Sequence, residues 1–238
     1  MGYLQTMCSR YTLTLTGEQL RERYDADPTD AFKPTYNAAP THLLPVITNE
    51  DQKGLSFFYW GVVPKMANNR TISPKLFNAR ADQLATKASY RNALRSRRCI
   101  IPADGYYDWK RVSKKGKTPY WIFMKDKTPF SFAGLWDEYD DEDGVTHHTF
   151  RIVTVDSNHI LDETADQMPA ILTKDQESVW LNEETSFEDL LSQLVTLPID
   201  QMETHSVSPK VNNQSVDIPD LIKHIPPADQ FGNYTLFN

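Results

Sequence analysis

The chain has 238 residues, with 25 Lys and Arg against 32 Asp and Glu, so its formal net charge is -7. The length allows one large domain or two small ones, and 39% hydrophobic with 24% charged residues is typical of a globular chain, not a disordered one. No apolar run approaches the roughly 18 residues of a membrane span, so we expect no membrane partner.

The N-terminal third is predicted to alternate between short strands and helices. Residues 10–15 alternate as a strand does, and Thr16-Gly-Glu-Gln19 has the spacing of a capping box, which predicts a short helix through Tyr24. Residues 43–48 and 55–60 read as two strands around a turn at 49–54. The apolar spacing that follows predicts a helix over 81–95.

The middle of the chain is predicted to consist of consecutive strands. They cover 99–112, 119–124, 130–136 and 146–155, with polar turns at 114–117 and 140–144. Two further capping patterns predict helices near 174–182 and 186–195. Strands dominate and helices are peripheral, which favours a β-rich α+β fold with a mostly antiparallel sheet or a partly closed barrel. Nothing marks a second domain, so we expect residues 1–238 to form one.

The average charge hides an uneven distribution. From Lys65 to Lys117 there are 14 basic and three acidic residues, a net charge of +11, so the rest of the chain carries -18. Aromatic residues accompany this basic segment, namely Trp60, Phe77, Tyr106, Tyr107, Trp109, Tyr120 and Trp121. A charge run is usually a solvated face. Cations with flat rings are also the composition of a groove that binds single-stranded nucleic acid.

Other functional classes find no support in the sequence. The six histidines have no partners at metal-ligand spacing, and no glycine-rich loop for phosphate occurs, so we expect neither a metal nor a cofactor. The first residues lack the basic start and apolar run of a secretory signal. Two cysteines, Cys8 and Cys99, make no disulfide framework. We therefore expect a cytoplasmic protein.

Cys8 is the first residue with distinctive chemistry, because it directly follows Met7. A cysteine at a chain's first position exposes an α-amine beside a thiol, and that amine has a pKa near ~7.7–8, so part of it is neutral at neutral pH. A neutral amine attacks an aldehyde to form a Schiff base, and the thiol then closes a thiazolidine ring. The alternative is a small buried hydrophobe, the usual place of a lone cysteine.

Seven strings in order resemble one family. They are Tyr36-Asn-Ala-Ala-Pro-Thr41, Trp60-Gly-Val-Val-Pro64, Phe77-Asn-Ala-Arg80, Arg98-Cys-Ile-Ile-Pro-Ala-Asp-Gly-Tyr-Tyr-Asp-Trp-Lys110, Phe132-Ala-Gly-Leu135, Met168-Pro-Ala-Ile-Leu172 and Val207-Ser-Pro-Lys-Val-Asn-Asn213. With Met7-Cys8-Ser9-Arg10 in front, the chain resembles the SRAP (SOS response-associated peptidase) family of abasic-site processing proteins, over nearly its whole length.

The resemblance implies a compact, β-rich protein that binds single-stranded DNA and captures the aldehyde of an abasic site on an N-terminal cysteine. It also implies removal of the protein's own initiating residue. By position, Cys8 is the nucleophile and Asn78 contacts the sugar-derived adduct. Arg10 and Arg80 hold phosphates, and Trp109 and the Pro40 turn pack near the strand. We expect a monomer that lies on the nucleoid when it is bound to DNA.

The chain departs from the family pattern at three places. Asp108 stands where the family usually has Glu, so it keeps the carboxylate but is one methylene shorter. Ala165 stands where a histidine is usual, and His159 replaces it only if that loop folds differently. Residues 1–7 precede Cys8, and while they remain Cys8 has no free amine. Either Met7 is the true start, which we favour, or the extension is cleaved.

These departures leave two other functions open. One is a single-stranded DNA-binding protein that has lost its cross-linking chemistry, with the Ala165 and Asp108 changes as its marks. The other is a thiol peptidase or amidase that acts on a small molecule or a protein.

Overall fold

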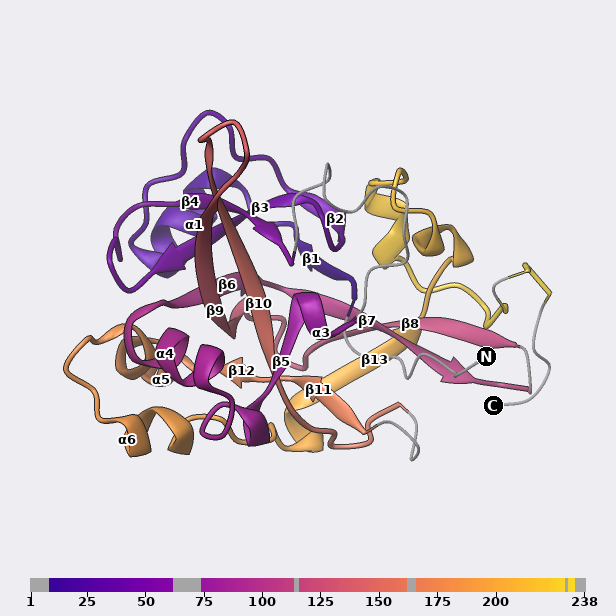
Figure 1. Cartoon of the computed structure of the whole chain (residues 1–238). Coiled ribbons are helices and arrows are strands. Elements are labelled where there is room, and N and C mark those ends of the chain that lie inside the picture. Colours follow the sequence, from indigo (N-terminus) through magenta and orange to yellow (C-terminus); the bar gives the residue numbers. More distant parts are fainter. Residues whose placement is uncertain (1–8, 62–73, 114–115, 162–165, 230, 234–238) are drawn as a thin grey trace.

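The computed structural model describes residues 9–61, 74–113, 116–161, 166–229 and 231–233 (Figure 1). The strands are β1 (Tyr11–Leu13), β2 (Thr35–Ala38), β3 (Leu43–Thr48), β4 (Ser56–Trp60), β5 (Asn78–Arg80), β6 (Arg98–Ala103), β7 (Gly105–Arg111), β8 (Lys117–Met124), β9 (Phe130–Asp140), β10 (Thr146–Asp156), β11 (Gln167–Pro169), β12 (Ile171–Leu172) and β13 (Met202–Ser206). The α-helices are α1 (Gly17–Tyr24), α3 (Pro74–Phe77), α4 (Ala88–Ser96), α5 (Lys174–Leu181) and α6 (Phe187–Ser192). The 3₁₀ helices are η1 (Ala81–Gln83), η2 (Ile199–Gln201), η3 (Pro209–Asn212) and η4 (Pro219–Ile222).

Five strands close on themselves as a barrel. β10 pairs with β4, β4 with β3, β3 with β6 and β6 with β9, and β9 pairs with β10 again. Only the β4–β10 pairing in this ring is parallel. β11 and β12 add antiparallel pairings to β10 and β9, and β5 lies parallel to β10. The predicted β-rich α+β fold with a partly closed barrel is confirmed, while the single domain stays a prediction.

A second, antiparallel sheet lies beside the barrel. Its strand order is β13-β8-β7-β1-β2. The two sheets meet at Asp104, where β6 ends and β7 begins. The Asp104 carboxylate accepts hydrogen bonds from the Thr12 hydroxyl (2.5 Å) and from the Thr14 backbone N–H (2.6 Å). The continuous strand predicted over 99–112 is therefore wrong. It breaks at Asp104, which is bonded to residues about ninety positions earlier, and there the chain passes from one sheet to the other.

Local capping signals were reliable and apolar spacing less so. Thr16 with Gln19 caps α1, and Thr173 with Gln176 caps α5, as predicted. The single helix predicted over 81–95 is wrong. The short helix η1 ends at Gln83, and α4 begins only at Ala88. The last predicted helix, 186–195, is the shorter α6.

The core of the barrel is aromatic. Tyr11 and Trp60 meet edge to face with ring centroids 5.4 Å apart, and Trp60 stacks on Phe150 at 6.1 Å. All three side chains are fully buried. A second, smaller cluster holds Tyr107, Val207, Val211 and Leu221 on the outer side of the second sheet. In Figure 1, α4, α5 and α6 lie together beside the barrel, away from this second cluster.

Candidate DNA-binding and catalytic site

The short strand β1 places Arg10 between two of the sequence motifs. Tyr11 pairs with Ala38 of β2 on one side and with Tyr106 of β7 on the other. The Tyr107 backbone N–H donates to the Arg10 carbonyl at 3.0 Å. The residues that follow Cys8 thus lie between the strand that leads to Pro40 and the strand that carries Asp108.

The Pro40 turn is fixed against the end of β4. Thr41 has a positive φ of 78°, an unusual conformation for a β-branched residue. Its N–H donates to the Trp60 carbonyl at 2.9 Å, and the Trp60 N–H donates to the His42 carbonyl at 3.0 Å. Pro40 itself is buried. These two hydrogen bonds hold the turn against the end of β4.

Asn78 is held next to the same end of β4. The Trp60 indole N–H donates to the Phe77 carbonyl at 2.8 Å, which fixes the residue before Asn78. Along β10, Trp60 lies opposite Phe150 and Asn78 lies opposite Ile152. Asn78 is only 2% exposed.

Gly61 allows this close approach between the two segments. Its φ is +86°, and a Cβ at this position would lie 2.7 Å from the Phe77 Cβ. Segments 10–11, 38–42 and 77–78 thus all meet at Trp60, although they are far apart in the sequence. They carry the predicted site residues Arg10, Pro40 and Asn78.

Arg80 is engaged by protein partners. Its Nη2 lies 2.9 Å from the Asp82 carboxylate, and this hydrogen bond raises the pKa of Arg80 and lowers that of Asp82. When the Gln167 amide is oriented to satisfy its neighbours, its oxygen also accepts from the Arg80 Nε at 3.2 Å. The side chain of Arg80 is 38% exposed, so one side still faces solvent. Asp82 and Gln167 were missed from the sequence; the i, i+2 spacing of Arg80 and Asp82 was the available signal.

β7 sends Asp108 and Trp109 to opposite faces. Strand alternation places Asp108 on the side of Tyr106, which packs in the main core, and Trp109 on the side of Tyr107, which packs in the second cluster. The Asp108 Oδ1 accepts from the Trp109 backbone N–H at 2.8 Å. The Trp109 indole N–H donates to the Asn212 side chain at 2.9 Å.

Arg10 is largely buried, with 9% exposed surface, and its Nη1 donates to the Ser9 carbonyl at 2.6 Å. Cys8 and Ala165 lie outside the described residues. His159 is exposed in the turn after β10, with a φ of 59°.

The interpretation of the basic segment and its aromatic residues as a groove that stacks bases is wrong in part. Trp60, Phe77, Tyr106 and Tyr107 are buried, so their rings cannot stack on bases. Arg98 is fully buried, and its guanidinium donates to the carbonyls of Leu94, Arg95, Trp180 and Asn182.

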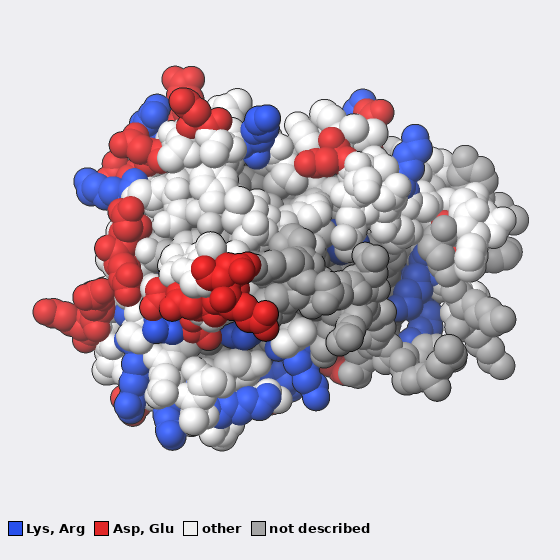
Figure 2. Space-filling model, turned by 45° about the horizontal axis from the view of Figure 1, so that its top comes forward, with Lys and Arg blue, Asp and Glu red and all other residues white. Residues whose placement is uncertain are grey.

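Arg97 also has an intramolecular role. It pairs with Asp137 at 2.5 Å and with Glu138 at 3.4 Å, both on β9 near the acidic end of its hairpin with β10. On the face shown in Figure 2, acidic residues gather on the left and near the centre, and basic ones lie along the lower edge and to the right. Part of the +11 therefore stabilises the fold.

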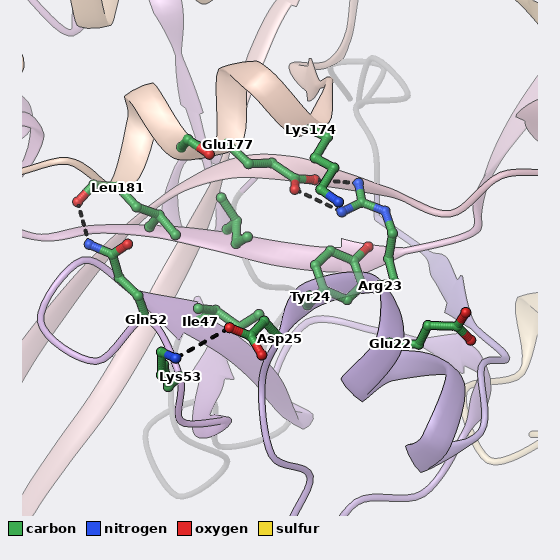
Figure 3. Close-up of a pocket in the computed structure, with 12 residues that line it drawn as sticks. Glu22, Arg23, Tyr24, Asp25, Ile47, Gln52, Lys53, Lys174, Glu177 and Leu181 are labelled. Atoms are coloured by element: carbon green, nitrogen blue, oxygen red, sulfur yellow. Dashed lines mark hydrogen bonds and ion pairs between the residues drawn. The ribbon is translucent and has the colours of Figure 1, made fainter.

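A cavity of about 320 Å³ lies elsewhere, between α1, α5 and the outer side of the barrel (Figure 3). Within it, Arg23 points at Glu177 and forms two hydrogen bonds of 2.9 and 2.8 Å with the carboxylate. Lys53 pairs with Asp25 at 3.3 Å. None of the predicted site residues that the structure describes lines this cavity. Within the described part of the chain, no cluster of three His, Cys, Asp or Glu has metal-site geometry, and no helix is long and apolar enough to cross a membrane.

Comparison with known proteins identifies the family of the chain. A sequence model of the family described as SOS response associated peptidase (SRAP) matches residues 7–214. The chain is 36% identical over 222 residues to the abasic site processing protein YoqW of Bacillus subtilis, covering 91% of this chain and 99% of that protein. It is also 36% identical over 227 residues to YoaM of the same organism, named in the same way, covering 92% and 100%.

A solved structure shares the fold. The crystal structure of a protein from Bacteroides thetaiotaomicron has a TM-score of 0.80 with this one at 28% identity, covering 92% of this chain and all of that one. The family match over most of the chain, the two full-length relatives and the shared fold lead to one conclusion: the chain belongs to the SOS response associated peptidase family.

Proposed function

We propose that this protein binds single-stranded DNA and traps abasic sites covalently through Cys8, as part of the response to DNA damage. The observation that carries the proposal is the meeting of segments 10–11, 38–42 and 77–78 around Trp60. The first of these segments begins two residues after Cys8. Membership of the family and the naming of the two Bacillus relatives as abasic site processing proteins support it.

The chemistry needs the amine and the thiol of one residue. The neutral α-amine of Cys8 adds to the C1′ aldehyde of the ring-opened sugar, and loss of one water gives an imine. The Cys8 sulfur then adds to the imine carbon while the nitrogen takes up a proton, which closes a thiazolidine ring. The sum is one C–N bond and one C–S bond formed and one water released, with no change of oxidation state.

The other predicted residues take supporting roles in this proposal. Asn78 hydrogen-bonds the sugar-derived adduct, and Asp108 moves protons during addition and water loss. Arg10 and the exposed side of Arg80 contact flanking phosphates, and Trp109 and the Pro40 turn pack near the strand. Because Ala165 cannot transfer a proton, we expect the step that a histidine assists elsewhere in the family to be slower here, by about 10²–10⁴-fold for a general acid–base group.

Cys8 has a free α-amine for this reaction only when residues 1–7 are absent. The family match begins at Met7, directly before Cys8, which supports a mature protein that starts at Cys8. We include self-removal of the residue before Cys8 in the proposed activity, in keeping with the peptidase of the family's description.

The test combines an intact-mass measurement with a cross-linking assay. Protein that starts at Cys8 is incubated with single-stranded DNA that contains one abasic site, and heat-stable adduct is measured on a denaturing gel. We expect heat-stable adduct from this protein and none from Cys8→Ala or Cys8→Ser. Both variants keep the α-amine and lose the thiol, so each should give stable adduct only after borohydride reduction of the imine. No adduct from the mature protein contradicts the proposal.

A second candidate is a single-stranded DNA-binding protein that no longer cross-links. Asp108 and Ala165 at positions where the family has Glu and His favour it, as does the engagement of Arg80 by Asp82. It predicts equal affinity for intact and abasic DNA and no effect of Cys8→Ala on either. Hydrolysis of peptides other than the protein's own N-terminus would instead indicate a thiol peptidase.

A further inference from the structure

The segment that follows β13 is tied to the second sheet at both of its ends. We call residues 207–225 the C-terminal strap; it is the yellow segment beside β2 and β8 in Figure 1. The Ile225 N–H donates to the Ser206 carbonyl at 3.1 Å, and the Ser206 hydroxyl donates back to the Ile225 carbonyl at 2.6 Å. Val207, Val211 and Leu221 pack its inner side on Tyr107. The strap is therefore a compact loop with its own small core.

Asn37 anchors the strap to β2. Its side chain is fully buried, and its amide nitrogen lies 3.3, 3.0 and 2.8 Å from the carbonyl oxygens of Val211, Asn213 and Val216. A buried amide that reaches three backbone carbonyls of one loop fixes the path of the loop, because the amide would otherwise be buried without acceptors. Asn37 lies three residues before Pro40, so the strap and the Pro40 turn share one strand.

Asp217 provides a second attachment to the same strand. Its carboxylate accepts from the Tyr36 backbone N–H at 2.5 Å and from the Thr35 hydroxyl at 3.1 Å. The Tyr107 hydroxyl donates to the Tyr36 carbonyl at 2.8 Å, which joins β7 to the same point. The strap, β2 and β7 therefore form one hydrogen-bonded unit.

The first helical turn of the strap, η3, ends at a residue that contacts Trp109. η3 is capped by Ser208, whose side chain accepts from the Lys210 N–H, and the helix ends at Asn212. The Asn212 Oδ1 accepts the Trp109 indole N–H at 2.9 Å. Trp109 is half-buried at the edge of the second cluster, so part of its surface is open to solvent. An indole held by its single donor at such an edge keeps one orientation.

We propose that Asn212 is a positioning residue for DNA binding: it holds the Trp109 ring in the orientation in which a base of the bound strand stacks on it. Asn37 and Asp217 keep Asn212 at a fixed place relative to the Pro40 turn. The inference rests on the proposed function, since it assigns a role in binding single-stranded DNA. It also assigns a role to Asn37 and to the string Val207–Asn213, which take no part in the cross-linking chemistry.

The test is a double-mutant cycle on affinity for intact single-stranded DNA. Asn212→Ala removes the acceptor, and Trp109→Phe keeps a ring but removes the donor. A lost hydrogen bond of this kind costs about 0.5–1.5 kcal/mol, so we expect each change to weaken binding, Asn212→Ala by about 2- to 10-fold. The double variant should bind as Trp109→Phe does, because Asn212 acts only through the indole N–H.

A neighbouring asparagine supplies the matched control. The Asn213 side chain accepts from the Ser215 N–H at 3.0 Å and its link to Asn37 uses the backbone carbonyl, so Asn213→Ala should bind DNA as the wild type does. The indole N–H resonance that Trp109→Phe removes should shift in Asn212→Ala and stay in place in Asn213→Ala.

Two different failures are distinguishable. If the wild type binds no single-stranded DNA, the proposed function is wrong. If the wild type binds and Asn212→Ala binds equally well, or if its effect adds fully to that of Trp109→Phe, the role of Asn212 is wrong while the proposed function stands.

Discussion

Asp82 holds the guanidinium of Arg80 from two residues further along the chain, with Nη2–Oδ2 at 2.9 Å and Nε–Oδ1 at 3.1 Å. Arg80 is the cation that the proposed function assigns to a phosphate beside the lesion. A DNA phosphate therefore has to share this guanidinium with a carboxylate that is already in place, and the carboxylates of Asp156 and Asp166 add to the negative field around it.

Replacing that carboxylate should tighten binding. We expect Asp82→Asn to raise the affinity for single-stranded DNA by roughly 1.5- to 5-fold, the size of an exposed ion pair of about 0.2–1 kcal/mol. The salt dependence of binding should become steeper, because a freed arginine neutralises one more phosphate. Titrations at several salt concentrations measure both effects.

Asp30→Asn is the control for net charge, since it removes one exposed carboxylate elsewhere and should change the affinity little. If Asp82→Asn weakens binding as much as Arg80→Ala does, Asp82 orients Arg80 for the phosphate and does not compete with it.

The second cysteine, Cys99, should be unreactive toward alkylation in the folded protein. Cys99 is fully buried in β6, and burial raises the pKa of its thiol, so almost no thiolate forms at neutral pH. We expect native protein treated with iodoacetamide to carry label only at Cys8, with Cys8→Ala unlabelled until it is unfolded. Peptide mass spectrometry identifies the site. Rapid labelling of Cys99 in native Cys8→Ala would show that β6 opens readily.

Arg98 should matter for stability and not for DNA. Its guanidinium is fully buried and donates to four backbone carbonyls that end α4 and α5. Arg98→Met leaves these carbonyls without a donor, and we expect a loss of about 3 kcal/mol or more in the free energy of unfolding, because each buried group left unsatisfied costs about 1–3 kcal/mol. Urea denaturation measures it. Arg95→Met, on the exposed side of α4, should cost less than about 1 kcal/mol.

Acid should destabilise the fold through His42. Burial lowers its pKa, the positive charge of Arg10 lowers it further, and Asp217 opposes the shift. Above the usual pKa near 6.5 the imidazole is neutral in both states and contributes nothing to pH dependence. As the pH falls through 6.5 the unfolded chain takes up the proton first, so stability decreases until the lower folded pKa is passed.

His42→Gln isolates this contribution. We expect the difference in unfolding free energy between pH 7.5 and pH 5.5 to be smaller in His42→Gln than in the wild type. An unchanged difference would mean that other groups account for the acid sensitivity of the protein.

The local parts of the fold were predictable from the sequence. The caps of α1 and α5 depend on Thr16 with Gln19 and Thr173 with Gln176, pairs only three residues apart, and both formed as predicted. The corner at Asp104 was not predictable in this way. Its bonds reach Thr12 and Thr14, about ninety residues earlier, and no local pattern reports such a partner.

The site shows the same limit. The motif strings located Arg10, Asn78 and Arg80 by order alone, but counting charges treated Arg98 as a surface cation. Only the folded chain shows that Arg98 lies in the core and that Asp82 engages Arg80. Sequence order thus proposes the residues of the site, and tertiary contacts show which of their charges are already engaged by the protein.

The pairing of β10 has a consequence for how the protein can change over time. This strand is bonded to β9, β4, β5 and β11, and it sets Asn78 opposite Ile152 beside the Trp60–Phe150 pair. Inserting or deleting one residue in it would turn its side chains to the other face and move Asn78 away from the Pro40 turn. Substitutions such as those at positions 108 and 165 leave that alignment intact. A change in the length of β10 is therefore expected to disturb the proposed site more than a single substitution at position 108 does.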